Sequence, residues 1–135
     1  MVSELNDFLA HERGHRARFG AELIRRNRAR CRTYFWCGLG GLALGVATGL
    51  AGRRAIAATT VAIERVVLRH MREQIEALQF VDAQATETLR WIVAEEQQHH
   101  DLSAERLATA RFWPTLINPV VSASTEAVIW LGMRL

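Results

Sequence analysis

The sequence contains no lysine, so all 17 of its basic residues are arginine, and it has only two cysteines and two prolines. Cys31 and Cys37 are too few and wrongly spaced for a cysteine-ligated zinc site, and they imply no disulfide framework. Pro114 and Pro119 both lie near the C-terminus, so the residues before them can form long helices without a proline break. The sequence also has no glycine-rich phosphate loop, so it contains no recognisable nucleotide site. We find no nucleophile paired with a base in it either.

The composition favours an all-α fold. Half of the 135 residues are apolar, the best helix-forming residues dominate, and no stretch alternates in the way a strand requires. A chain of this length can form one hydrophobic core, so we predict a single domain over residues 1–135. We expect helices at about residues 3–31, 33–52, 54–79, from Asp82 onward and 120–134. Asp82 should cap its helix after a turn at 80–82, and the two prolines should mark the entry to the last helix.

An uncharged apolar segment occupies residues 33–52 and is just long enough to cross a bilayer. Gly41, Gly45 and Gly49 recur every four residues and predict a smooth face for close helix packing. A spanning helix, an interfacial helix and a buried core helix are all open, and we favour a partly embedded helix that packs on its own bundle. Arginines flank the segment and suit an anionic membrane surface, although a solvated helix end or a nucleic-acid patch also fits them: Arg25, Arg26, Arg28, Arg30, Arg32, Arg53 and Arg54.

Two segments share the pattern Glu-x-x-His, namely Glu12-Arg-Gly-His15 and Glu96-Gln-Gln-His99. Residues three apart lie on one face of a helix, so each carboxylate and imidazole can bind the same ion. Paired motifs of this kind on separate helices are the ligand pattern of ferritin-like di-iron bundles. Oxygen and nitrogen ligands with open positions suit iron, which can bind and reduce oxygen.

Glu64 is a third candidate ligand because of its distance from the predicted turn. It lies 16 residues before Phe80, and Glu96 lies 16 residues after it. On two antiparallel helices both carboxylates would therefore stand about 24 Å from the turn, at the same height. Apolar residues surround Glu64, and a buried lone charge needs a partner such as a metal ion. The alternative is that Glu64 faces water.

The chain resembles the demethoxyubiquinone hydroxylases, a quinone-modifying branch of the ferritin-like di-iron proteins. The resemblance extends over nearly the whole chain and rests on the first ligand helix, the glycine-rich segment, the third-helix acid, the last ligand motif and the C-terminus: Glu12, His15, Arg18 and Phe19, Leu39–Gly52, Thr60–Glu64, Glu95–Asp101 and Ala127–Leu135. His70 also matches the family. Met71 departs from it, because the family usually has tyrosine there. The family also has an earlier helix with a further glutamate ligand, which we do not expect in this chain.

The resemblance implies a di-iron monooxygenase that hydroxylates demethoxyubiquinone with O₂ and an external reductant. It implies two iron ions held by Glu12, His15, Glu64, Glu96 and His99, in an antiparallel ferritin-like bundle with a membrane-contacting helix. The partners would be a membrane quinone and the membrane surface, with no nucleic acid. The charged N-terminus predicts no cleaved leader, and we expect a peripheral protein on the cytoplasmic face of the cell membrane.

Two alternatives stay open at this stage. The chain would be a non-catalytic homologue that binds lipid or assists a quinone-synthesis complex, or an iron-binding homodimer whose second copy supplies the missing carboxylate. Two other histidines are not expected to bind metal: His11 should be exposed, and His100 should lie outside the ligand set or face solvent.

Overall fold

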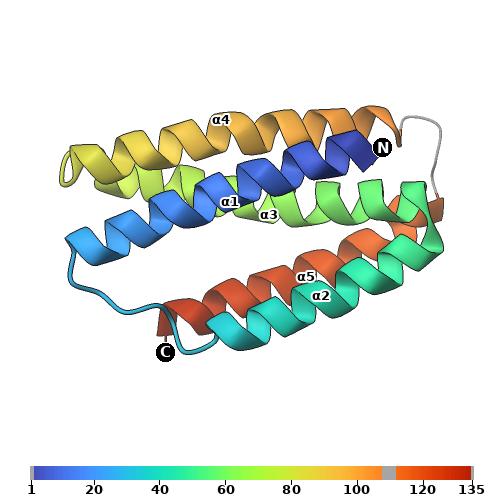
Figure 1. The fold of residues 1–135 in the computed structure, drawn as a ribbon, viewed down its shortest axis with the longest axis horizontal. Coiled ribbons are helices and arrows are strands. Elements are labelled where there is room, and N and C mark those ends of the chain that lie inside the picture. The colour runs from blue at the N-terminus through green and yellow to red at the C-terminus, as the bar shows by residue number, and fades with distance from the viewer. Residues whose placement is uncertain (1, 108–111, 135) are drawn as a thin grey trace.

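The computed structural model describes residues 2–107 and 112–134, except for the side chains of Val2 and Glu4, and it contains five α-helices. Figure 1 shows them as a layered bundle, with no strand among the residues described. The all-α prediction is therefore confirmed, whereas the prediction of one domain over the whole chain stays a prediction. The helices are α1 (Val2–Arg25), α2 (Tyr34–Ala51), α3 (Arg53–Leu78), α4 (Ala83–Glu105) and α5 (Phe112–Arg134).

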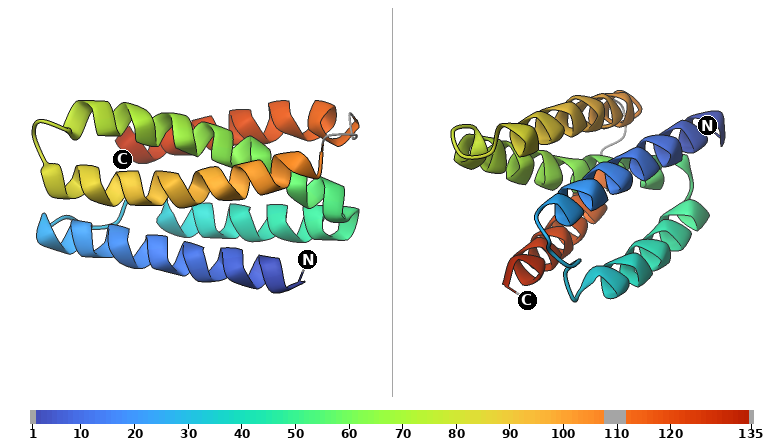
Figure 2. Two further views of the ribbon diagram at one scale, coloured as in Figure 1. Left: turned by 90° about the horizontal axis from the view of Figure 1, so that it is seen from above. Right: turned by 60° about the vertical axis from the view of Figure 1, so that its left-hand side comes forward.

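Helix α3 is the centre of the bundle. It packs against α4 on one side and α5 on the other, while α2 lies on α3 and α1 lies on α4 (Figure 2). The three alanines Ala55, Ala58 and Ala62 are completely buried, and such small side chains let neighbouring helices approach closely. Between α3 and α4 the core contains larger side chains, among them Met71 and Ile92.

The α3–α4 turn agrees with the sequence prediction. The carboxylate of Asp82 accepts a hydrogen bond from the Ala85 N–H at 3.0 Å, so Asp82 is the N-cap of α4. Arg25, the last residue of α1, and Arg26, which follows it, also donate hydrogen bonds to this carboxylate. The turn therefore fixes the register of the hairpin and also holds the C-terminal end of α1.

Helix α1 ends earlier than predicted, at Arg25 rather than near residue 31. Asn27 has a positive φ of 50°, a conformation that asparagine tolerates better than most residues. The Asn27 N–H donates to the carbonyl of Ile24, and the Arg28 N–H donates to that of Leu23, as in a Schellman motif. The arginine-rich residues after Asn27 therefore leave the helix, although arginine itself is a good helix former.

The predicted start of the last helix, near residue 120, is also wrong. Helix α5 begins at Phe112 and contains Pro119. Pro114 lies in the first turn, where a missing N–H costs nothing because that group has no partner within a helix. Pro119 lies inside the helix, so the helix continues through a residue that we expected to precede it.

Helix α2 is on the outside of the bundle, and Thr48 is its only buried residue among those described. A Cβ atom added at Gly41, Gly45 or Gly49 would meet no atom within 4 Å, so the predicted close packing of this glycine face is not found. Gly52, with φ 97°, makes the sharp junction between α2 and α3.

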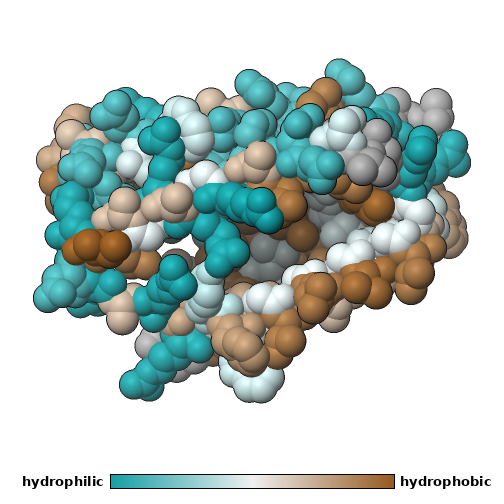
Figure 3. All heavy atoms as spheres, in the orientation of Figure 1, coloured by the Kyte–Doolittle hydropathy of each residue, from teal (hydrophilic) through white to brown (hydrophobic). Residues whose placement is uncertain are grey.

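The apolar surface is concentrated on the two outer helices. Helices α2 and α5 are each long and apolar enough to cross a membrane by length and composition, yet only 6% of each such segment is buried. In Figure 3, hydrophobic residues gather along the lower edge, where Figure 1 places α2, and hydrophilic residues cover the upper layer that contains α4. Exposed side chains of these two helices include Phe35, Trp36, Leu42, Phe112, Val120 and Trp130.

Candidate metal centre

The five predicted ligands come from three helices and meet in the middle of the bundle. Ligand atoms of Glu12, His15 and Glu96 lie within 4.8 Å of one another, and so do those of Glu64, Glu96 and His99. The two groups share Glu96, so the arrangement has the form of a two-ion site with one common carboxylate. The prediction that Glu64 and Glu96 stand at the same height is thus confirmed.

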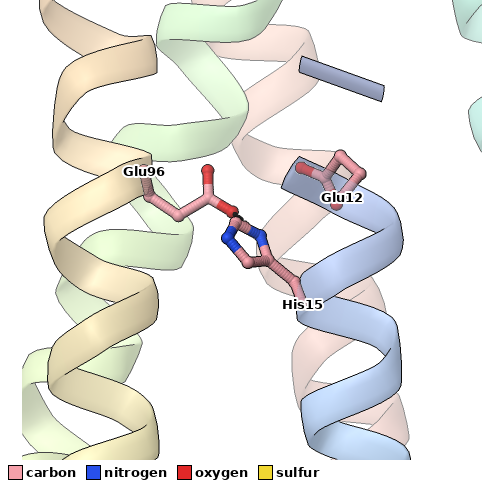
Figure 4. A group of neighbouring side chains, drawn as sticks. All are labelled: Glu12, His15 and Glu96. Carbon is pink, nitrogen blue, oxygen red and sulfur yellow. Dashed lines mark ion pairs between the residues drawn. The ribbon is translucent and has the colours of Figure 1, made fainter. Parts of the chain in front are cut away.

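Helix α1 supplies the first pair of ligands. Figure 4 shows His15 pointing across to Glu96 of α4, with Glu12 on the same helix beside it. The His15 Nδ1 atom is 3.0 Å from Glu96 Oε1, yet it has no aligned hydrogen-bond partner. Two ligands of one ion adopt this relation, because their lone pairs point at the ion and not at each other.

The other ligands are deeply buried. His99 is 2% exposed, Glu96 is 6% and Glu64 is 7%, so the alternative in which Glu64 faces water is wrong. Oxygen Oε2 of Glu64 is buried without any hydrogen-bond partner. Leaving a buried carboxylate oxygen unpaired is costly, and a cation is the partner that would remove this cost.

Burial also shifts the protonation of the two central carboxylates. Loss of hydration, together with the nearby negative charges of Glu96 and Glu12, raises the pKa of Glu64 to about 9. The pKa of Glu96 is raised to about 7 for the same reason, although His15 opposes the shift. Without a cation Glu64 keeps its proton at neutral pH and Glu96 is partly protonated, and a divalent ion would replace these protons.

The sequence analysis overlooked two residues that contact the ligand imidazoles. His11, expected to be exposed, is half-buried, and its Nδ1 atom is 2.8 Å from Nε2 of His99. Glu95 Oε2 is 2.9 Å from Nε2 of His15. A signal for His11 was present, because His11 and His15 are four residues apart and must share a helix face.

His100 lies outside both ligand groups, as expected. Its Nδ1 atom is 3.0 Å from Asp101 Oδ1 on the same helix, and it has no contact with the central carboxylates among the interactions described. His70, which the family resemblance singled out, contacts Glu126 at 2.8 Å and so joins α3 to α5, away from the centre.

A cavity of about 420 Å³ adjoins the centre on the side between α1 and α3. Its lining includes the candidate ligands together with Phe8, Ile63, Val67 and Met71, so it is polar at the ligands and mostly apolar elsewhere. A second cavity of about 460 Å³ shares Arg16 and Phe19 with the first and extends toward Leu23 and Leu78. The two cavities are therefore neighbours along α1.

The fold and this site define a class of protein: a helical bundle whose paired Glu-x-x-His motifs bring together two groups of carboxylates and histidines that could hold metal ions. The model of the family described as ubiquinone biosynthesis protein COQ7 matches residues 1–132. The chain therefore belongs to this family.

Curated relatives carry names that agree with the family. The NADPH-dependent 3-demethoxyubiquinone 3-hydroxylase, mitochondrial, of Rattus norvegicus is 35% identical over 70% of this chain and 45% of its own length. The 3-demethoxyubiquinol 3-hydroxylase of Rhodospirillum rubrum is 31% identical over 98% of this chain and 63% of its own length. The chain spans about half the length of the mammalian relatives that it matches. No solved structure matches the chain significantly.

Proposed function

We propose that this chain is the di-iron part of a demethoxyubiquinone hydroxylase of ubiquinone biosynthesis. The observation that carries the proposal is the convergence of two Glu-x-x-His motifs and Glu64 on one buried site in a chain of this family. The names of the relatives supply the substrate, because each describes hydroxylation of a demethoxyubiquinone or its quinol. The non-catalytic alternative is disfavoured, because all five predicted ligands are present and gathered.

The donor atoms fit iron. Three carboxylates and two imidazoles offer hard oxygen and intermediate nitrogen ligands, without a thiolate. Glu12, His15 and Glu96 would hold one ion, and Glu64, Glu96 and His99 the other. When bound, the iron pair supplies the activation of O₂, and the protein supplies ligand geometry and a largely dry pocket.

The adjoining cavity is the proposed place for the quinone ring. It borders the ligands on one wall, and its other walls are apolar, which suits a ring that carries few polar atoms. The isoprenoid tail would extend along the second cavity between α1 and α3, past Phe19 and Leu23. The reductant would act from outside the chain, since the rat relative is named NADPH-dependent and this sequence has no phosphate loop.

The site is open toward that cavity, and this supports the participation of a further segment. Among the described residues the centre has Glu12, Glu64 and Glu96 as carboxylate ligands, while Glu95 is engaged by His15. A fourth carboxylate from a second copy of the chain, or from another member of a quinone-synthesis complex, would complete the ligand set. Sedimentation of the iron-loaded protein tests this, and a fully active monomer would contradict it.

The experiment for the activity uses purified protein reconstituted anaerobically with ferrous iron. We expect one to two iron atoms per chain by elemental analysis, and conversion of a short-tailed demethoxyubiquinone to its hydroxylated product when O₂ and a chemical reductant are added. The variant Glu64→Ala should lose both iron and product. Product formation by an iron-free preparation would contradict the proposal.

We also propose peripheral attachment to a membrane, on the cytoplasmic face of the cell membrane. The exposed apolar residues of α2 and α5 support it, as do the arginines that are not engaged elsewhere. Arg25 and Arg26 bind Glu22 and Asp82, so Arg28 and Arg32 are better candidates for lipid contact. Arg28→Gln with Arg32→Gln should weaken co-sedimentation with anionic liposomes at low salt. Equal binding by wild type and variant would contradict this role.

A further inference from the structure

The two ligand histidines have different partners on their outer nitrogens. Each imidazole directs Nδ1 toward the carboxylates of the centre: His15 Nδ1 is 3.0 Å from Glu96, and His99 Nδ1 is 3.7 Å from Glu96 and 3.8 Å from Glu64. The opposite nitrogen, Nε2, therefore points away from the ions that the carboxylates would hold. It contacts Glu95 in the case of His15 and His11 in the case of His99.

His11 is not itself placed as a ligand. Its Nδ1 atom meets the nitrogen of His99 that faces away from Glu64 and Glu96, and His11 belongs to neither group of converging ligand atoms. The pattern His11-Glu12-Arg-Gly-His15 also matches H-E-x-x-H, in which both histidines bind one zinc ion. Here the His15 ring faces Glu96 whereas the His11 ring contacts His99, so the zinc interpretation does not fit.

The contact between His11 and His99 is specific in its geometry. The rings are nearly parallel, at 7° with centroids 5.1 Å apart, and Phe8 lies against the ring of His99 with centroids 4.1 Å apart. The N···N distance of 2.8 Å is that of a hydrogen bond. When the Nδ1 lone pair of His99 faces a metal ion, its Nε2 carries the proton and donates it to His11 Nδ1.

A metal-bound imidazole usually donates its other N–H to a carboxylate, a carbonyl or water, and that partner fixes the tautomer and the ring orientation. We propose that His11 is a positioning residue that does this for His99, as Glu95 does for His15. The centre consequently has two unlike halves, one supported by a negatively charged carboxylate and the other by a neutral imidazole. This inference rests on the proposed function only in that it requires the site to bind metal.

The test uses Co²⁺ as a probe, which reports by its visible absorption and needs no turnover. We expect His11→Leu to weaken Co²⁺ binding by about 10–100-fold in one of two binding steps, and to change the visible spectrum of that step. His11→Asn should restore most of the affinity, because its side-chain oxygen stands as far along the side chain as Nδ1 of histidine and can accept the same hydrogen bond. A merely structural role would not distinguish these variants in this way.

Two further variants make the test sharper. Glu95→Ala should weaken the other binding step, with its own spectral change, because it removes the partner of His15. His100→Leu is the matched control, since His100 contacts Asp101 and not the centre, and it should bind Co²⁺ as the wild type does. Circular dichroism of each variant checks that the bundle is intact.

The outcomes separate the two proposals. Absence of Co²⁺ binding by the wild type would overturn the metal centre, and with it the role of His11. Wild-type binding that His15→Ala abolishes but His11→Leu leaves unchanged would overturn the role of His11 alone. Equal loss in His11→Leu and His11→Asn would also overturn it, because an accepted hydrogen bond would then not be the property that matters.

Discussion

Helices α3 and α1 both carry ligands of the proposed metal centre, but different forces hold the two helices in place. Ten residues of α3 are buried, and most of them are apolar. Among the described side chains of α1 only His15 is buried, while Leu5, Leu9 and Ile24 are exposed. Burial of apolar side chains therefore holds α3 in place, whereas such burial contributes little to the position of α1.

Apart from the contact of Phe8 with the His99 ring, polar and charged side chains make the contacts described between α1 and its neighbours. Its middle is held by His15 with Glu95, and its C-terminal end is held by the arginines that bind Asp82. In addition, the guanidinium of Arg18 lies 3.7 Å from the centre of the Trp91 ring. Exposed polar pairs contribute little to stability. If residues of α1, α3 and α4 bind metal ions together, as we propose, those ions would be a main attachment of α1 to the bundle.

The largest effect should come from removing the ligands. We expect His15→Ala combined with His99→Ala to abolish iron binding and to release α1, while α3, α4 and α5 stay folded. Hydrogen exchange measures this directly: amides of α1 should lose protection and amides of α3 should keep it. His70→Ala with His100→Ala is the control and should keep both iron and protection. Retention of iron by the first variant would show that the ligand assignment is wrong.

The reverse experiment alters the apolar core. Ile92 is completely buried, so Ile92→Ala should lower the free energy of unfolding by about 2–5 kcal/mol. The same substitution at Ile24 of α1, which is 82% exposed, should change it by less than about 0.5 kcal/mol. Urea unfolding of the metal-free proteins gives both values. Similar losses at the two sites would remove the distinction between the helices.

A third prediction concerns pH. The pKa of Glu64 is about 9 in the folded protein against 4.5 as the ordinary value, so the folded metal-free chain keeps a proton that the unfolded chain releases between these pH values. Stability from this group is full below about pH 4.5 and falls as the pH rises toward 9.

Glu64→Gln removes that titration. At pH 8 and with a chelator present, this variant should be more stable than the wild type by up to about 5 kcal/mol, with a flatter dependence of stability on pH. Glu76→Gln, an exposed change on the same helix, should leave the wild-type slope unchanged. A wild-type stability that rises between pH 5 and 8 without metal would contradict the assignment.

The smallest effect is expected at the turn that anchors the end of α1. Asp82→Ala removes the cap of α4 and the partner of Arg25 and Arg26, so it should lower the melting temperature slightly. Asp82→Asn keeps a capping oxygen and loses the charge. It should stabilise α4 as the wild type does, yet allow faster hydrogen exchange at the C-terminal end of α1. Identical exchange in all three proteins would show that these ion pairs do not hold α1.

The sequence predicted the centre better than it predicted the helix ends. The meeting of Glu64 and Glu96 followed from the fixed rise of a helix and one identifiable turn, and such arithmetic does not depend on distant contacts. The end of α1 depended on a backbone conformation at Asn27 that competes with the helix propensity of the arginines after it. Pro119 was taken as a boundary because proline usually is one, and α5 is an exception.

The partners of the ligands were the part that sequence reasoning missed. His11 faces His99, 88 positions away, and such a pair depends on how α1 rotates about its axis against α4. The residues adjacent in the sequence give no information on that rotation, apart from the fact that His11 and His15 share a helix face. The same holds for Glu95, which lies directly before Glu96, the glutamate of the Glu-x-x-His motif, and is not itself part of that motif.

The segment between Asn27 and Thr33 has consequences for how the molecule could be divided. It contains Arg28, Arg30 and Arg32, all exposed and all outside a helix, which is where trypsin cleaves most readily. A cut there would leave α1 as a separate peptide that carries Glu12 and His15, and a second fragment that carries Glu64, Glu96 and His99. The metal ions would then join two molecules instead of two parts of one, and their affinity would depend on peptide concentration. A synthetic α1 added back to the second fragment would restore the centre in proportion to the amount supplied.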